Sequence, residues 1–200
     1  MTLPKPYLSW SAVECWRKSK PEYRRRYYEN LPQTWNSPEM LFGRDIGQLL
    51  ENNDPSLSHI PRGTHPEYRI LTDILDVPVL CYLDSFTPET KTILEYKTSR
   101  VGWDQARVDN HGQLLMYASA VRSKLGDYDP NVTLVWLETR QETRDVVVSG
   151  FTMQVPSIAL TGRVETFTRH IEPVELDTFG KELSDLAHEI SNDYAEWTSR

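Results

Sequence analysis

The stretch LCYLDSFTPETKTILEYKTS, residues 80–99, decides the fold of this 200-residue chain. Two apolar, β-rich runs flank the tripeptide Pro88-Glu89-Thr90, so the pattern predicts a β-hairpin. Asp84 lies at the end of the first run, and Glu95 and Lys97 lie at the end of the second. Residues two apart in a strand point to the same face. We therefore expect Glu95 and Lys97 to share a face, with Asp84 brought near both by the hairpin.

Hydrophobic periodicity and turn residues predict the remaining elements. Helices are expected at residues 8–30, 38–53, 104–125, 157–171 and 177–198, and strands at residues 67–75, 77–86, 91–99, 131–139 and 145–154. Pro21 is expected to divide the first helix, and the short polar segment Arg140–Arg144 is expected to join the last two strands as a hairpin. Residues 31–37 and 52–66 have the composition of loops. This order predicts an α+β (α/β) fold with one central mixed sheet flanked by helices.

Serines mark the starts of two of these helices. Ser9 or Ser11 can cap the first helix, and Ser37, followed by Pro38, can cap the second. The chain length suits one domain, or one domain with an appended helical piece. We expect a single domain over residues 1–200, with an N-terminal helical segment at 8–30, a core at about 38–155 and C-terminal helices at 157–198.

Charge and cysteine content limit the class of protein. The net charge of −7 argues weakly against a general nucleic-acid binder, but not against a nucleic-acid enzyme, because acids gathered for metals lower the net charge. A basic strip could still hold phosphates; it consists of Arg17, Lys18, Lys20, Arg24, Arg25 and Arg26. Cys15 and Cys81 are too few for a disulfide framework or a four-cysteine cluster. With no apolar run of bilayer length and no signal region at the N-terminus, a cytoplasmic protein without a membrane partner is expected.

Two carboxylates and an amine at one point suit the hydrolysis of a phosphodiester. The reaction needs a nucleophilic water near neutral pH, neutralisation of the transition state's negative charge and a stabilised leaving oxygen. Mg²⁺ or Mn²⁺ can supply all three, and oxygen ligands such as Asp84 and Glu95 hold these ions. The Tyr96 carbonyl can complete the shell, and Lys97 can orient or help to deprotonate the water. The alternative interpretation is an ordinary ion pair on the surface of a strand.

In combination, these residues resemble the motifs of the PD-(D/E)XK nuclease superfamily, in its RecB-like and phage-exonuclease branch. Asp84 matches the first acid of the motif, Glu95 the second acid and Lys97 the lysine. Gln113 and Tyr117, in HGQLLMYA, match the Gln-x-x-x-Tyr element, and their spacing places both on one helical face. The segments LSWSAVECWRKSKPEYRRRYYE and GRDIGQLLE resemble two further elements of the family, so that the resemblance covers about residues 8–137.

The resemblance implies a restriction-endonuclease-like core and metal-dependent hydrolysis of DNA, in the first place by an exonuclease of phage or bacterial recombination or repair. It implies Mg²⁺ or Mn²⁺ as cofactor, DNA as partner, and the bacterial host cytoplasm as location if a phage encodes the chain. Some relatives form rings or work beside a single-strand annealing or recombination protein, so a homo-oligomer and such a partner are compatible with it. Lys20-Pro21 replaces the Cys-Pro of iron–sulfur members, so no iron–sulfur cluster is expected. The chain has no P-loop, so no nucleotide cofactor is expected.

One position departs from the family pattern. Gly47 stands where RecB-like members carry a metal-binding His and other phage exonucleases carry a Glu. Glu67, at the start of the first predicted strand, is our first candidate for the missing ligand, and Glu51, one helical turn after Gly47, is the second. A solvated carboxylate is the alternative for each. Gln113 and Tyr117 are expected to brace the site or to touch the DNA backbone.

Further residues are expected to contact DNA. Arg24, Arg25 and Arg26 are interleaved with tyrosines that could pack on sugars or bases, and Arg100 and Trp103 follow the lysine strand. His111 is expected to be an exposed polar residue at a helix start, rather than a group that faces the cleft.

Three rival hypotheses remain open from the sequence. The first is a structure-specific endonuclease of the same family. The second is a non-catalytic DNA-binding module on this fold. The third is a generic α+β protein with accidental motif matches, for which the Asp84 and Glu95 carboxylates would lie far apart.

Overall fold

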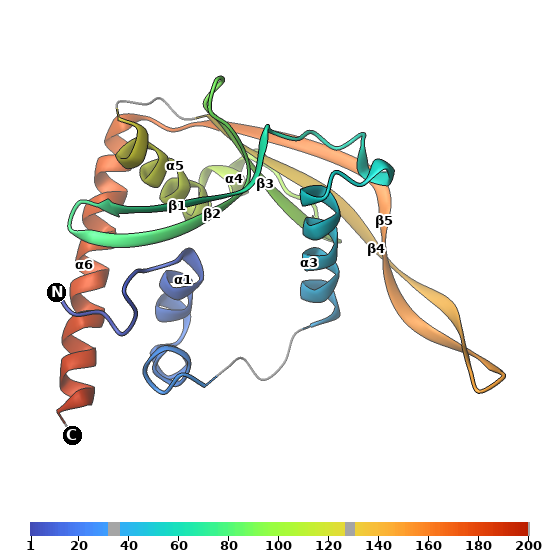
Figure 1. Cartoon of the computed structure of the whole chain (residues 1–200), viewed down its shortest axis with the longest axis horizontal. Helices are drawn as coiled ribbons and strands as arrows, with labels where there is room; N and C mark the ends of the chain where they lie inside the picture. Colours follow the sequence, from blue (N-terminus) through green and yellow to red (C-terminus); the bar gives the residue numbers. More distant parts are fainter. Residues whose placement is uncertain (32–36, 127–130, 200) are drawn as a thin grey trace.

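The computed structural model describes residues 1–31, 37–126 and 131–199; the expected loop at 31–37 falls mostly outside these ranges. A five-stranded sheet forms the centre, in the order β1 (His65–Ile74), β2 (Val77–Thr87), β3 (Thr92–Ser99), β4 (Asn131–Val148) and β5 (Phe151–His170). β3 and β4 pair in parallel, whereas the other neighbouring strands pair antiparallel. The mixed sheet flanked by helices (Figure 1) confirms the predicted α+β class and is consistent with a restriction-endonuclease-like core.

Several helices build the larger part of the core against the sheet. These are α1 (Trp10–Lys18), α2 (Lys20–Tyr23), the π-helical segment η1 (Arg24–Tyr28), α5 (Gly112–Leu125) and α6 (Pro173–Thr198). Ser9 begins α1 as predicted, because its Oγ accepts a hydrogen bond from the Ala12 N–H. The chain divides at Ser19, just before Pro21, so the predicted first helix is in fact three short segments. Within the described residues, no helix combines the length and apolar character needed to cross a membrane.

A parallel strand pair needs a long crossover, and two helices provide it between β3 and β4. The predicted single helix at 104–125 is divided into α4 (Gln105–Asp109) and α5, with Asn110 and His111 between them. Asp104 caps α4 through a hydrogen bond from the Arg107 N–H to its Oδ1, at 2.7 Å. The break lets α5 present Gln113 and Tyr117 toward the end of β3.

A second, smaller core lies between α3 (Pro38–Glu51) and the opposite face of the sheet. Ile46 and Leu50 of α3 pack with Leu94 of β3 and Val135 of β4. Ser37 caps α3 and Pro38 is its first residue, as predicted. A short 3₁₀ turn, η2 (Pro55–Leu57), closes this cluster. Two layers of side chains thus fix β3 in place, one on each face.

β4 and β5 form a long hairpin whose outer part projects beyond the other strands (Figure 1). Its turn is Ser149-Gly150, between the paired residues Val148 and Phe151. Both turn residues have positive φ, +50° and +83°, as a two-residue type I′ turn requires. The predicted hairpin at Arg140–Arg144 was therefore wrong. These polar residues are mid-strand, because both faces of the projecting hairpin are exposed to solvent.

The predicted helix at 157–171 was also wrong, because residues 151–170 form β5. Pro156 is accommodated in an outermost strand, where a missing N–H costs no sheet hydrogen bond when it faces outward. The run is also rich in β-branched residues, which favour strands. The C-terminal part after β5 is the single helix α6, which begins with a capping box at Glu172 and Glu175.

Candidate active site

The β2–β3 hairpin brings the two acids together where its ladder ends. The last antiparallel pair on this side is Ser85 with Leu94, so Asp84 and Glu95 occupy the next position, where no backbone pairing occurs. The Asp84 side chain replaces the missing partner, because its Oδ2 accepts a hydrogen bond from the Tyr96 N–H at 2.8 Å. Glu95 lies close enough to Asp84 to affect its pKa, so the two acids are near each other as predicted and not far apart as the hypothesis of accidental motif matches expects.

Lys97 is held by a chain of hydrogen bonds that runs from β3 to α5. Its Nζ donates to Glu95 Oε1 at 2.6 Å and to Gln113 Oε1 at 3.0 Å. Gln113 Nε2 then donates to the Tyr117 hydroxyl at 2.7 Å. Glu95 and Lys97 therefore share a face as predicted, and so do Gln113 and Tyr117. An ammonium has three donors, and these contacts use two of them.

When both are ionised, Asp84 and Glu95 carry more negative charge than Lys97 balances. Burial, and then the charge of Glu95, raise the pKa of Asp84 well above its ordinary value. Glu95 is 2% exposed, and its Oε2 has no hydrogen-bond partner among the described residues. Burial acts to lower the pKa of Lys97, but Glu95 and Asp84 outweigh it and leave the pKa above its ordinary value. The site therefore has a carboxylate oxygen without a partner among the described residues and, when both acids are ionised, a surplus negative charge.

A divalent cation fits this arrangement. Carboxylate oxygens are the ligands that Mg²⁺ and Mn²⁺ prefer, and a cation would relieve the repulsion that raises the pKa of Asp84. The Tyr96 carbonyl can contribute, because the N–H and C=O of one strand residue lie on the same edge and the Tyr96 N–H already points to Asp84. No three His, Cys, Asp or Glu side chains form a metal cage within residues 1–31, 37–126 and 131–199. Water would therefore complete the shell.

A cleft of about 670 Å³ opens beside the acids, between α3 and the ends of β1, β2 and β3. Asp84, Glu95, Tyr96 and Lys97 line it, and so do three positions from the sequence argument, Gly47, Glu51 and Glu67. A Cβ added at Gly47 would have no atom within 4 Å, so the missing side chain leaves open space. The structure thus brings both candidate replacement ligands to the same cleft.

Glu67 differs from Glu51 in its backbone and its electrostatics. Its φ is +45°, which a non-glycine residue rarely adopts and which marks local strain. Burial, and then the charges of Glu51 and Glu95, raise the pKa of its carboxyl group. Strain and a raised pKa are both common at functional sites, and this favours Glu67 as the third acid.

The basic strip of the N-terminal segment lies apart from this cleft, and part of it is engaged within the chain. Arg24 makes a bidentate ion pair with Asp193 of α6, and Arg25 makes a bidentate ion pair with Glu22. Arg26 lies over the Tyr27 ring at 5.7 Å. These side chains do not line the acid cleft. A contact of this strip with DNA stays a prediction.

Arg100 and Trp103, which follow β3, differ in exposure and in their contacts. Arg100 is exposed and lies on the turn that follows Ser99. Trp103 is half-buried, with the Arg107 guanidinium 3.8 Å from its ring centroid and His111 at 5.2 Å. His111 is not exposed as expected: burial, and then the charge of Lys97, lower its pKa to about 4. Trp103 therefore contributes packing beneath the site, whereas the exposed Arg100 side chain lies near Glu39 and is accessible to a ligand.

Two residues contribute to the site although the sequence does not predict them. Glu14 of α1 lies close enough to Lys97 and His111 to influence the pKa of each. Thr98 lines the cleft directly after Lys97. Neither residue belongs to a recognisable motif, so no sequence signal marked them.

Comparison with known proteins gives no assignment. No protein-family model and no curated protein matches the chain. One solved structure that partly matches it is the crystal structure of SSO0001, with a TM-score of 0.46 and 14% identity over 88% of this chain and 68% of that chain. Another is a "Putative exonuclease" from Eubacterium rectale, with a TM-score of 0.40 and 12% identity over 92% of this chain and 66% of that chain. At these values the matches carry no argument about activity.

Proposed function

We propose that the chain is a metal-dependent DNA nuclease of the PD-(D/E)XK superfamily, in its RecB-like and phage-exonuclease branch, and that it acts as an exonuclease. The observation that carries the proposal is the Asp84–Glu95 pair. Two adjacent carboxylates, one with a buried oxygen that has no hydrogen-bond partner among the described residues, face a lysine that donates a hydrogen bond to Gln113. The motif order along the chain supports the same conclusion.

Asp84, Glu95 and the Tyr96 carbonyl would hold the cation, with Glu67 as the next acid at the cleft and Glu51 after it. Mg²⁺ or Mn²⁺, when bound, supplies charge neutralisation and a water of lowered pKa. Lys97 is an ammonium at neutral pH, because its pKa lies above the ordinary value. Its third N–H is therefore available to donate to the attacking water or to a phosphate oxygen. Gln113 fixes this geometry, and Tyr117 fixes the orientation of the Gln113 amide.

Cleavage of end-labelled DNA tests the proposal. Linear and circular substrates are incubated with Mg²⁺, Mn²⁺ or a chelator, and with the variants Asp84→Asn and Lys97→Ala. Linear DNA should be degraded only with metal. Each variant should lose about 10²-fold or more in rate, the range of a lost proton-transfer or positioning group. Asp185→Asn, a change at an exposed acid of α6, should retain full activity.

The same assay separates the alternatives. Undiminished cleavage by both variants, or cleavage in chelator, would contradict the proposal. Cutting of circular DNA would select a structure-specific endonuclease. Binding without cleavage in any metal would select a non-catalytic DNA-binding module, the alternative that Gly47 and the absence of a three-ligand cage among the described residues keep open.

A further inference from the structure

A second pocket adjoins the acid cleft. It has a volume of about 350 Å³ and lies between α3, the turn after β3 and the β4–β5 hairpin. We call it the arginine pocket and define it by Phe42, Arg100, Arg107, Thr139, Arg140 and Ile158. It shares Glu39 and Thr98 with the acid cleft, so one opening continues into the other. A ligand that extends from the acids toward the hairpin would enter it.

The pocket is positive although the chain is negative overall. Three arginines line it against one carboxylate, Glu39. Arg100 makes no hydrogen bond or salt bridge within the described part of the chain. Arg140 is exposed and has Glu142 at 3.3 Å, while Arg107 donates to the Gly102 carbonyl at 3.2 Å. Arg100 is thus the arginine most available to an anion.

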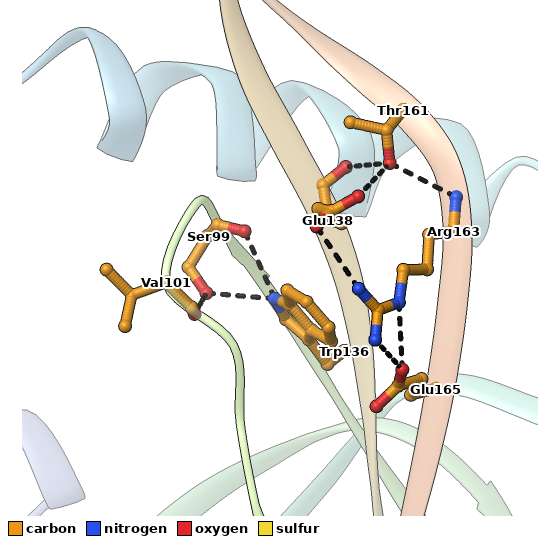
Figure 2. A network of polar contacts seen from close by, with 7 residues as sticks. All are labelled: Ser99, Val101, Trp136, Glu138, Thr161, Arg163 and Glu165. Atoms are coloured by element: carbon orange, nitrogen blue, oxygen red, sulfur yellow. Dashed lines mark hydrogen bonds and ion pairs between the residues drawn. The ribbon is translucent and has the colours of Figure 1, made fainter.

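The turn that carries Arg100 is fixed by β4 (Figure 2). Trp136 Nε1 donates to the Ser99 carbonyl at 3.1 Å and to Ser99 Oγ at 3.0 Å. Ser99 Oγ in turn donates to the Val101 carbonyl at 2.7 Å, so the backbone on both sides of Arg100 is held. An arginine on a preorganised turn loses less conformational entropy when it binds a ligand.

A β-bulge interrupts the pairing of β4 with β5 next to the arginine pocket. Leu137 pairs with Val164 and Thr139 with Leu160, so the segment Thr161–Arg163 lies opposite the single residue Glu138. Gly162 has a φ of +90°, a conformation that glycine adopts at no cost. Figure 2 shows the resulting network, in which Arg163 contacts Glu138 and Glu165 and Thr161 Oγ1 donates to Glu138 Oε2 at 2.7 Å. Bulges bend and twist strands, and beyond this one Arg140 and Ile158 line the pocket.

We propose that the arginine pocket holds one unpaired nucleotide of the nucleic-acid strand that enters the acid cleft. The phosphate would lie on Arg100 and Arg140, and the base would lie against Phe42 and Ile158. This proposal rests on the proposed function. Arg100 follows Lys97 by three residues, about 10 Å along an extended chain, so both can act on one strand.

The size and lining of the pocket favour a single strand over a duplex. Its volume lies near the lower end of the range for small-molecule sites, roughly 300–1,000 Å³. Proteins that bind single strands combine cationic side chains for the backbone with hydrophobic surfaces on which bases stack. Phe42, Val101 and Ile158 supply such a surface beside the arginines. A base pair brings two bases and two backbones, which a pocket of this size does not accommodate.

Fluorescence anisotropy in chelator tests the pocket without cleavage. A short labelled single strand and its blunt duplex are titrated with the wild-type chain, Arg100→Gln, Arg140→Gln and the double variant. The double variant should bind the single strand at least about tenfold more weakly, because hydrogen bonds to charged groups are lost. The slope of log Kd against log salt should fall by about 0.7 for each arginine removed. Arg69→Gln, a change at an exposed arginine of β1, should bind like the wild type.

Two results would overturn the inference: equal single-strand affinity in the double variant and the wild type, or tighter binding of the blunt duplex than of the single strand. Metal-dependent cleavage, measured in parallel, distinguishes this failure from failure of the proposed function. Normal cleavage with unchanged affinity in the double variant would refute the pocket alone. Absent cleavage with the expected loss of affinity would refute the nuclease and support the pocket as a strand-binding site.

Discussion

Asp84 has both a structural role in the β2–β3 hairpin and a proposed role in metal binding. It lies where β2 and β3 separate, and its carboxylate takes the hydrogen bond that a backbone carbonyl would otherwise accept. Its pKa is raised by burial and by Glu95. The unfolded chain has an ordinary Asp with a pKa of about 3.9. Between these two pKa values the folded chain binds more protons, so without metal Asp84 lowers stability as the pH rises through that window.

Asp84→Asn should therefore stabilise the metal-free protein at neutral pH. The amide oxygen can still accept the Tyr96 N–H, and the amide N–H can donate to the buried Glu95 Oε2, which has no other partner among the described residues. We expect the free energy of unfolding to increase by about 1–3 kcal/mol. Urea denaturation in chelator at a series of pH values measures this. The decrease in stability above the unfolded pKa should become smaller in the variant.

Asp185→Asn is the matched control and should show neither effect. Lower stability of Asp84→Asn at neutral pH, or a pH dependence identical to that of the wild type, would mean that Asp84 carries no surplus charge in the folded chain.

At the scale of elements, local signals account for the parts of the fold that the sequence predicted. The β2–β3 hairpin follows from its turn residues, and α1 and α3 follow from the caps Ser9 and Ser37. The acid–acid–lysine constellation was predictable because it needs only this hairpin and the two-residue period of a strand. Gln113 and Tyr117 share one helical face, as their spacing predicts. The sequence alone gives no distance between Gln113 and Lys97, so their hydrogen bond is known only from the structure.

The β4–β5 hairpin could not be predicted because its outer part has no local preference that decides it. Its residues are polar and exposed, and its pairing comes from Ser149-Gly150 and from contacts between residues far apart in sequence. Pro156 does not prevent this pairing, because an outer strand tolerates proline. The arginine pocket was missed for the same reason, since Arg140 and Ile158 meet Arg100 only through this hairpin.

Truncation of the hairpin tests how independent its outer part is. Thr143 pairs with Pro156, so residues 144–155 can be replaced by Asn-Gly, a sequence suited to a two-residue turn. We expect the free energy of unfolding to change by less than about 1 kcal/mol, because the removed side chains are mostly exposed. Chemical denaturation measures the change. A loss of several kcal/mol would show that the outer hairpin holds the core together.

At the scale of the whole molecule, the N-terminal segment is fastened to the C-terminal helix. Arg24 and the Tyr28 hydroxyl both contact Asp193, and Lys20 and the Trp16 indole both contact Glu189. The hydrogen bond from Arg24 lowers the pKa of Asp193, and its stabilisation is therefore present at neutral pH and is lost as the pH falls through the folded pKa. Lys20 and Arg24 of the basic strip thus form ion pairs between the N-terminal segment and α6.

A double-mutant cycle of Arg24→Gln and Asp193→Asn measures the coupling energy of this ion pair. The Asp193 side chain is 18% exposed and that of Arg24 is 40% exposed, so we expect a coupling energy of about 1 kcal/mol at neutral pH, disappearing at acid pH. Urea denaturation gives the four stabilities. If Arg24 binds DNA and does not stabilise the contact with α6, the coupling energy will be near zero and Arg24→Gln will weaken oligonucleotide binding instead.

The central claim is that the Asp84–Glu95 pair is a divalent-metal site, and calorimetric titration with Mn²⁺ tests it most directly. We predict one Mn²⁺ per chain, with an affinity that rises with pH because Asp84 must lose its proton. The binding should raise the melting temperature of the wild type and of Asp185→Asn, and both effects should be lost in Asp84→Asn. Absence of saturable binding, or equal binding by Asp84→Asn, would contradict the account.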